Sequence, residues 1–434
     1  MLNQSTPTET HPLIANPYHA VAAMFANQAE WLIRNAFGNV CFTGQQHTVQ
    51  PGDLVMAGSH GIAIGPGTPD AIDTALAWLR RTASTNILVW SATGNNESDL
   101  HLVSRGCRDS FRPLWMGKSL ELPLPDPGTS AEVEIGLATP HDLPAILAAT
   151  GVPYVATSKM QHLLYLTTSN EIPKRAWMLV ARRKRLFGDD RIVGLAILHL
   201  STFGDDTVGA LYNLGVDPSW RGRGIGSALV ATIARIARGQ GATALVLNAT
   251  EDGARVYRRQ GFVELGSGQT WHLPADSLRA SLAPETVNVA EALARGETSR
   301  LDPTVATWST LLNGDSPVAF AARFGQPATV DWLLAAGAEP DLVALWKMGR
   351  RDAATSAAFD PRWRDAQRGP ERTTPLHEAI RLNDRDLAEM LIAAGANTQI
   401  RDAHWGSRPL EWANAMGRHD LADLIRRAMF GPTG

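Results

Sequence analysis

The sequence is poor in cysteine and in net charge, and both shortages exclude classes of protein. Its two cysteines, Cys41 and Cys107, form no Cys-x-x-Cys pair. They therefore exclude a disulfide framework and favour a reducing cytoplasm with two small buried thiols, although one disulfide between them is the alternative. The net charge of −3 gives no electrostatic case for nucleic acid or an anionic membrane. The 12 histidines lack ligand spacing, so no metal site is indicated.

Long apolar runs are also missing. No segment approaches the roughly 20 residues of a membrane helix, and the N-terminus lacks the basic and apolar regions of a signal peptide. We therefore expect a soluble, cytoplasmic protein with a frayed polar N-terminal tail. The hydrophobic content of 44% and charged content of 19% are typical of globular domains. The length of 434 residues predicts about three domains.

A glycine-rich turn at residues 217–226 carries the clearest ligand chemistry. It joins an apolar strand pattern to a helical pattern, and the free amides in the first turn of a helix bind anions. Gly222, Gly224 and Gly226 tolerate positive φ and remove Cβ atoms, while Arg221 and Arg223 add charge. The turn therefore predicts a phosphate or pyrophosphate site, with a solvated turn as the alternative.

The spacing of this turn decides which phosphate ligand it fits. No Gly-Lys-Ser/Thr follows the glycines, and the dinucleotide fingerprint has a different spacing. The spacing Arg221-x-x-Gly224-x-Gly226, after Leu214-Gly215-Val216, resembles the acyl-CoA loop of the GNAT N-acetyltransferases.

A second segment strengthens that resemblance. A buried strand pattern at 243–247 precedes Asn248 and a helical stretch that carries Tyr257 and ends at Gly261-Phe262. This order is similar to the second signature of the same family. We expect Thr250 to cap the helix and Gly261 to take the left-handed position after it.

The resemblance implies a mechanism in which a substrate amine attacks the acetyl-CoA thioester directly. In the family the pantetheine lies between two splayed strands, and the departing thiolate receives a proton from a tyrosine, here Tyr257. A tyrosine pKa near 10 and a thiol pKa of about 8.5 suit hydrogen-bond donation with late proton transfer. The residues that the resemblance places at acetyl-CoA are Leu214, Gly215, Val216, Arg221, Gly222, Arg223, Gly224, Ile225, Gly226, Ser227, Asn248 and Tyr257.

Some of these roles have structural alternatives. Tyr257 could instead be core material between its helix and the sheet, and Asn248 either lines the acyl site or caps the strand end. The general base stays unassigned. Asp205 and Asp206 resemble a turn, Asp217 lies in the loop, and Tyr212 and Asn213 either touch the acceptor or organise a water.

The resemblance defines a central domain over residues 126–278. A strand pattern at 133–138, a capped helix after Thr139, strands at 177–181 and 192–198 and a closing strand around Trp271 follow the family order, with a mixed central sheet and flanking helices. Residues 1–125 resemble the back half of a second, degenerate GNAT copy, because a strand from 86, a helix from 99, Gly106 and a strand near 115 follow one another. An unrelated α/β cap is the alternative.

Residues 285–434 resemble an ankyrin array, an all-α repeat solenoid. Thr374-Pro-Leu-His and Arg408-Pro-Leu-Glu place prolines 409 − 375 = 34 positions apart, close to the ankyrin period of about 33. Pro317 and Pro375 are 58 apart, so an intervening repeat is degenerate or carries an insertion within 350–372. Thr374 and His377 are structural in the motif. The tip residues Arg401, Asp402, His404 and Trp405 either contact a partner or form a solvated loop.

Together these patterns predict an acetyl-CoA-dependent N-acetyltransferase with no metal and with ankyrin repeats that bind a protein. The acceptor is either a small amine or a protein amine, and an array that holds a protein substrate would raise its local concentration. The alternative from another class is a non-catalytic acyl-CoA sensor or ankyrin adaptor, which would have no need of Tyr257.

Overall fold

The computed structural model forms two compact units, Met1–Ser98 with Asp109–Ala275 and Asp99–Arg108 with Asp276–Gly434. Within its described residues, no helix is both long and apolar enough to cross a membrane. The described residues are 11–35, 40–42, 54–57, 60–63, 69–70, 72–74, 77, 87–91, 96–109, 113–124, 132–155, 160–183, 191–273, 283–308, 311, 315–368, 372–403, 406–416 and 418–430.

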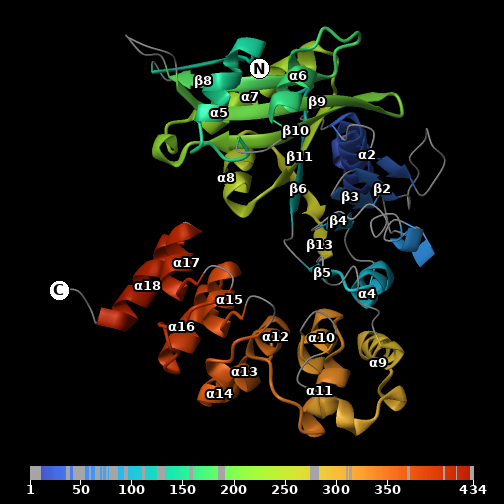
Figure 1. Cartoon of the computed structure of the whole chain (residues 1–434), viewed down its shortest axis with the longest axis vertical. Coiled ribbons are helices and arrows are strands. Elements are labelled where there is room, and N and C mark those ends of the chain that lie inside the picture. Colours follow the sequence, from blue (N-terminus) through green and yellow to red (C-terminus); the bar gives the residue numbers. More distant parts are fainter. Residues whose placement is uncertain are drawn as a thin grey trace, which may run out of the picture. The chain divides into compact units, whose positions relative to one another are not determined.

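A mixed sheet organises the first unit (Figure 1). In the described part of the chain its strand order is β12-β6-β11-β10-β9-β8-β7. Strands β10 and β11 are parallel and the other neighbours are antiparallel, which confirms the expected mixed sheet. The strands are β6 (Leu114–Ser119), β7 (Val133–Leu137), β8 (Ala176–Arg183), β9 (Arg191–Phe203), β10 (Asp206–Val216), β11 (Ala244–Ala249) and β12 (Val263–Ser267).

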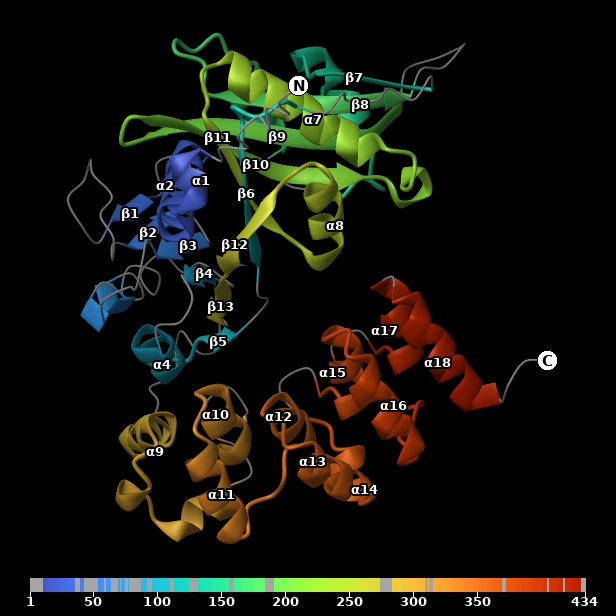
Figure 2. The same cartoon turned by 180° about the vertical axis from the view of Figure 1, so that it is seen from behind.

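Helices cover both faces of this sheet. Leu229 of α7 (Ile225–Gly239) packs with Leu198 and Leu245 on one face, together with α8 (Glu251–Arg259). The short helices of the other face lie in front of the sheet in Figure 1, and α7 lies in front of it in Figure 2, which is seen from behind. Because both faces are covered, β9 is buried almost throughout.

The opposite face is covered by a helix from the N-terminal region and by two helices of the central region. Phe25 packs with Val208 and Val246, and Ile146 packs with Met178. We call this side the α2 face. Its helices are α1 (Pro12–Ala15), α2 (Pro17–Asn35), α5 (Leu143–Ala148) after the 3-10 turn η1 (Pro140–Asp142), and α6 (Met160–Thr168).

A second sheet in the first unit has the order β1-β2-β3-β4-β13-β5 within the described residues. Its last strand in sequence, β13, pairs with β4 from Gln269↔Ser91 to Leu273↔Ile87. We expected the strand around Trp271 to close the sheet of residues 126–278, and that expectation is wrong. The strands are β1 (Val40–Phe42), β2 (Leu54–Ala57), β3 (His60–Ala63), β4 (Ile87–Ser91), β5 (Arg108–Asp109) and β13 (Gln269–Leu273).

The two sheets exchange their last strands. Strand β6 follows β5 in sequence but lies between β11 and β12, and β13 follows β12 but lies between β4 and β5. Each half has the order strand, helix, glycine, strand, strand, as β4, α4 (Asn96–Ser104), β5, β6 and as β11, α8, β12, β13. Gly106 and Gly261, which follow the two helices, have φ of 89° and 80°. This correspondence is the one that two related copies would produce.

Local signals at helix ends were predicted correctly. The Thr250 hydroxyl accepts a hydrogen bond from the Gly253 amide at 3.2 Å and caps α8. Thr139 and Asp142 form a capping box at the entry to the helical turn before α5, and the Asp142 carboxylate also pairs with Arg182 at 2.8 Å.

The second unit is a series of helix pairs. Its repeat helices begin after the caps Ser316, Asp341, Thr374 and Arg408, which gives steps of 341 − 316 = 25, 374 − 341 = 33 and 408 − 374 = 34 residues. The repeat expected between Pro317 and Pro375 is therefore present, with an aspartate cap in place of Thr-Pro. The helices are α9 (Pro284–Arg295), α10 (Pro317–Arg323), α11 (Pro327–Ala335), α12 (Leu342–Lys347), α13 (Arg351–Ala358), α14 (Pro361–Arg364), α15 (Pro375–Arg381), α16 (Arg385–Ala393), α17 (Pro409–Ala415) and α18 (His419–Phe430), with 3-10 turns η3 (Thr298–Arg300) and η4 (Pro303–Thr307).

Thr374 and His377 are structural residues, as we expected, and His377 also ties neighbouring repeats together. The Thr374 hydroxyl lies 2.8 Å from His377 Nδ1, and His377 Nε2 lies 3.1 Å from the Ser407 carbonyl. A carbonyl only accepts, so Nε2 carries the proton and Nδ1 is the acceptor. His377 is fully buried, and burial lowers its pKa, so the neutral form is the structural one.

The expected partner contacts at the repeat tip divide into two groups. Arg401 is exposed and pairs with Glu411 at 3.3 Å. Asp402 is only 3% exposed and accepts hydrogen bonds from the Ser407 amide (2.8 Å) and the Trp412 indole (3.0 Å). The expectation that Asp402 projects to a partner is therefore wrong, because its carboxylate is used inside the repeat. His404 and Trp405 lie outside the described residues.

Candidate functional site

The end of β10 departs from regular sheet geometry. Its parallel ladder with β11 ends at Leu211↔Leu247, although β10 continues to Val216. Its register against β9 shifts between Tyr212 and Gly215, and Asn213 has a φ of 52°, a region that L-residues other than glycine rarely adopt. The bulge contains Leu214. Beyond Leu211 and Leu247 the two neighbouring strands no longer pair with each other, and we call this unpaired end of the ladder the opening between β10 and β11.

The glycine-rich turn follows directly and opens α7. Gly222 and Gly224 have φ of 76° and 79°, and Gly224 is the N-cap of α7 without a side-chain cap hydrogen bond. Acidic residues are absent from the first turn, which contains Ile225, Gly226 and Ser227. An ideal Cβ built on Gly222 or Gly224 meets no atom within 4 Å. The helix therefore presents uncapped amides to open space, which is the geometry of an anion site.

Arginines surround this helix end. The Arg221 Nε donates to the Val216 carbonyl at 3.3 Å. The Arg223 and Arg183 guanidinium carbons lie 4.5 and 5.0 Å from the centre of the Trp220 ring, which belongs to the 3-10 turn η2 (Pro218–Trp220). The Arg223 side chain is half-exposed, as is its partner Glu132 at 3.4 Å. The positive charge of these arginines therefore adds to the positive end of the α7 dipole.

Asp217 has a structural role at the start of the turn. Its carboxylate accepts from the Ser219 hydroxyl (2.7 Å) and amide (2.9 Å) and from Arg191 at 2.9 Å. These hydrogen bonds, those of Ser219 first, lower its pKa, which is unsuitable for a base near neutral pH. Asp206, another acidic candidate, lies at the far end of β10, where Thr243 donates to it at 3.0 Å.

A loop from the α5–α6 connection lies over the bulge. A Cβ on Gly215 would meet the Pro153 carbonyl oxygen at 2.6 Å, so the residue must be glycine for the loop to approach this closely. Tyr154 in the same loop has a φ of 68°, and its charge would act on Tyr257. Sequence reasoning missed Tyr154, because nothing local links it to a helix a hundred residues away.

Tyr257 lies on α8, beside the strand that borders the opening. Its side chain is 5% exposed, and its ring centre lies 5.6 Å from that of Phe262. Burial, with a smaller contribution from Tyr154, raises its pKa above the usual value for tyrosine. The hydroxyl therefore stays protonated across the physiological range.

Asn248 lies one residue past the end of the β10–β11 ladder. Its Nδ2 donates to Gln28 Oε1 of α2 at 3.3 Å, and its Oδ1 is buried without a hydrogen-bond partner among the described residues. That oxygen is therefore not used to cap the strand end within the described residues. Gln28, 220 residues away in sequence, gave no signal in the sequence.

The fold and this opening define the class of protein: an acyltransferase-type α/β domain joined to a helical repeat array. Residues 157–262 match the Acetyltransferase (GNAT) family, and residues 372–403 match the Ankyrin repeat. The chain thus contains a central region that matches the GNAT acetyltransferases and a C-terminal region that matches the ankyrin repeats. Within the described residues no group of three His, Cys, Asp or Glu side chains could hold a metal ion.

Individual relatives match one region each. A glucosamine 6-phosphate N-acetyltransferase of Trypanosoma brucei brucei is 37% identical over 75 residues, which are 17% of this chain and 51% of that enzyme. The chain thus spans about half the length of that relative. Cyclin-dependent kinase 4 inhibitor B of Mus musculus is 33% identical over 129 residues, 27% of this chain and 95% of the inhibitor. Among solved structures, a GCN5-related N-acetyltransferase from Kribbella flavida aligns with a TM-score of 0.43 at 20% identity, covering 58% of this chain and 95% of that one.

Proposed function

We propose that the chain is an N-acyltransferase that transfers acetyl from acetyl-CoA to a primary amine by direct attack. One observation carries the proposal: the opening between β10 and β11 lies beside the uncapped N-terminus of α7 and beside Tyr257. Such a site has room for an extended chain between strands, amides for a pyrophosphate and a protonated hydroxyl for a leaving thiolate.

The residues divide the work by position. Main-chain groups of Leu214 and Val216 pair with the pantetheine as an added strand would, and the amides of residues 223–227 hold the pyrophosphate with Arg221 and Arg223. Tyr257 donates its proton to the sulfur as the C–S bond breaks. Asn248 faces the acyl group, and Tyr154 covers the site. The amine nitrogen supplies the electron pair of the new amide bond and gives up one proton.

The N-terminal and C-terminal regions have accessory roles in this proposal. Residues 1–125 are a degenerate GNAT-like copy, supported by the exchanged strands β6 and β13. The ankyrin array of residues 285–434 binds a protein, either as substrate or as localising partner. The acceptor is thus a protein amine or a small amine. One relative, from Trypanosoma brucei brucei, is a glucosamine 6-phosphate N-acetyltransferase. Glucosamine 6-phosphate is therefore the first small amine to assay.

Two measurements test the function. Acetyl-CoA should raise the melting temperature by a few degrees at 100 times its Kd, since binding then adds about 2.7 kcal/mol, and ATP at the same concentration should raise it less. Thiol release from acetyl-CoA should appear with at least one member of a panel of glucosamine 6-phosphate, polyamines and lysine peptides. Stabilisation without turnover on any amine would favour the acyl-CoA sensor. Absence of stabilisation would remove the cofactor assignment.

A further inference from the structure

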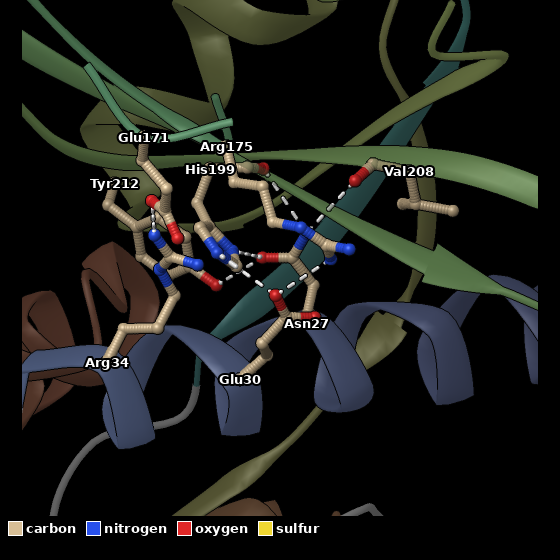
Figure 3. Close-up of polar contacts among 8 residues, drawn as sticks. All are labelled: Asn27, Glu30, Arg34, Glu171, Arg175, His199, Val208 and Tyr212. Atoms are coloured by element: carbon tan, nitrogen blue, oxygen red, sulfur yellow. Dashed lines mark hydrogen bonds and ion pairs between the residues drawn. The ribbon is translucent and has the colours of Figure 1, made fainter. Parts of the chain in front are cut away.

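A polar cluster fills the space between α2 and the sheet (Figure 3). Its members come from the N-terminal helix, from the segment before β8 and from β9 and β10, which are far apart in sequence. We call it the α2 cluster. It consists of Asn27, Glu30, Arg34, Glu171, Arg175, His199 and Tyr212.

Asn27 fixes the state of His199. Its Nδ2 donates to the carbonyls of His199 (3.2 Å) and Val208 (3.0 Å), which sets the orientation of the amide. Its Oδ1 therefore accepts, from the Tyr212 hydroxyl at 2.9 Å and from His199 Nδ1 at 3.1 Å. Because an amide oxygen has no proton to give, Nδ1 of His199 must carry the ring hydrogen. Nε2 is then unprotonated and can only accept a hydrogen bond through its lone pair.

No hydrogen-bond donor among the described residues reaches that lone pair. His199 is 0% exposed, and its Nε2 has no hydrogen-bond partner among the described residues. It faces Glu30, whose Oε1 lies 3.7 Å away. Burial, and after it the charges of Arg34 and Arg175, lowers the pKa of His199 to about 3, so the ring stays neutral. A buried acceptor without a donor is costly, and a proton on Glu30 would supply one.

One member of the cluster lies where the β10–β11 ladder ends. Tyr212 immediately precedes the bulge, and Trp31 stacks on its ring at 5.5 Å and contacts the His199 ring at 5.3 Å. Next to Asn27 on α2, Gln28 holds Asn248 at the end of β11. Helix α2 thus contacts the end of both splayed strands. It does so on the face opposite to α7, whose N-terminus is the anion site.

We propose that Glu30 is the general base of the acyl transfer and that His199 is its positioning residue. The inference rests on the proposed function. Glu30 is the member of the pair that is open to solvent, since its side chain is 32% exposed and His199 is enclosed. The base therefore comes from the N-terminal half of the chain, and the acid Tyr257 from the central domain.

The proton balance closes with these groups. The amine nitrogen forms the C–N bond as the C–S bond breaks, and its surplus proton passes to the Glu30 carboxylate. The new O–H then donates to His199 Nε2. Tyr257 gives its proton to the thiolate and regains one from solvent, while Glu30 returns one to solvent. The net reaction converts amine and thioester into amide and thiol.

Two arginines of the cluster, Arg175 and Arg34, differ in their contact with Glu30. Arg175 lies 3.0 Å from its Oε1. Arg34 pairs with Glu171 and not with Glu30. Glu171 therefore offers a matched control: a carboxylate of the same cluster that is paired with an arginine and has no contact with His199.

The test compares Glu30→Gln with Glu171→Gln by thiol release on the best amine of the panel. Glu30→Gln should lower kcat/KM for the amine by about 10²-fold and remove the acidic limb of its pH profile. The acetyl-CoA-induced rise in melting temperature should remain. His199→Gln should shift that limb, and Glu171→Gln should leave both rate and profile unchanged.

The outcomes separate this inference from the proposed function. If the wild type turns over and Glu30→Gln has an unaltered pH profile, the assignment of Glu30 as the base is wrong, while the proposed transferase function is unaffected. No acetyl-CoA binding by the wild type overturns both. A readout that needs no activity measurement is the ¹⁵N spectrum of histidine-labelled wild-type protein, with His199 assigned by the loss of its signal in His199→Gln. A proton on Nδ1 and a bare Nε2 are expected, and a proton on Nε2 would contradict the pair.

Discussion

At the scale of single residues, Tyr257 is the side chain whose environment most directly matches a chemical task. A hydroxyl that is to protonate a thiolate must itself be protonated before the step. Burial raises the pKa of Tyr257, so the folded protein retains the phenol at pH values where a free tyrosine would start to ionise. The acid is therefore available throughout the pH range in which an amine acceptor is neutral.

Tyr257→Phe should lower kcat by about 10²-fold and leave the KM for acetyl-CoA within error, because the ring still packs on Phe262 while the proton donor is lost. Thiol release under saturating acetyl-CoA measures this. The matched control is Tyr165→Phe, whose side chain is exposed and whose helix α6 packs on the face of the sheet opposite to α8. Equal rates in wild type and Tyr257→Phe would reduce Tyr257 to core material.

His377 makes the second unit sensitive to acid. Its pKa is lowered in the fold from an ordinary 6.5, so between the two values the unfolded chain binds a proton that the folded chain does not. Stability is therefore complete above about pH 6.5 and is lost as the pH falls toward the folded pKa. Hydrogen exchange of the full chain, corrected for intrinsic rates, should show α15 and α17 opening more easily at pH 5 than at pH 7.5.

His377→Gln should remove that pH dependence, and it should cost about 1–3 kcal/mol because the bond to the Ser407 carbonyl is weakened. His419→Gln at the start of α18 serves as the control and should leave the dependence in place. An opening free energy of α15 that stays constant from pH 7.5 to 5 would refute the assignment of the neutral ring.

Sequence reasoning at this scale worked where function is local. The glycines of residues 222–226 were readable because conformation and charge are concentrated in five consecutive positions. The prediction for Asp402 failed, because a carboxylate near a turn looks the same whether it points to solvent or to Trp412. Asn27 and Glu30 were out of reach, since their partner His199 lies 172 residues from Asn27.

At the scale of elements, the N-terminus of α7 depends on backbone that only glycine adopts without strain. Gly224→Ala places an L-residue at a φ of 79°, at a cost of about 1–2 kcal/mol. The Kd for acetyl-CoA should rise roughly tenfold, or about 1.4 kcal/mol, as the amides turn away. Gly239→Ala at the other end of the same helix has open space for its Cβ and no positive φ. It should be neutral or stabilising by up to about 1 kcal/mol.

Calorimetric titration of acetyl-CoA into both variants checks the expectation. If both alanines weaken binding alike, the effect belongs to the helix as a whole and not to its first turn.

Elements themselves were predicted well, since hydrophobic periodicity and caps such as Thr250 are local. The pairing of the strands was not predicted, because the alternation of apolar and polar residues indicates a strand but does not identify the neighbouring strand.

At the scale of the whole molecule, the exchange of β6 and β13 links the two sheets of the first unit. Strand β6 follows β5 of one sheet but is paired only in the other, and β13 follows β12 in the reverse sense, so the chain between each pair of strands ties the two sheets together. Helix α2 of the N-terminal half also contacts the end of β11, through the hydrogen bond of Asn248 to Gln28.

This linkage predicts a single unfolding transition for the first unit. Trp115 on β6 is 2% exposed and packs edge-to-face on Phe25 of α2 at 5.2 Å, so Trp115→Ala should cost about 3–5 kcal/mol. Hydrogen exchange of the full chain should show protection falling together in β4, which pairs with β13, and in β11, which pairs with β6. Val263→Thr on the exposed side of β12 is the control and should change neither. If β4 kept its protection while β11 lost it, the sheets would be separate folding units, and the first copy would not be required for the site at the end of β10.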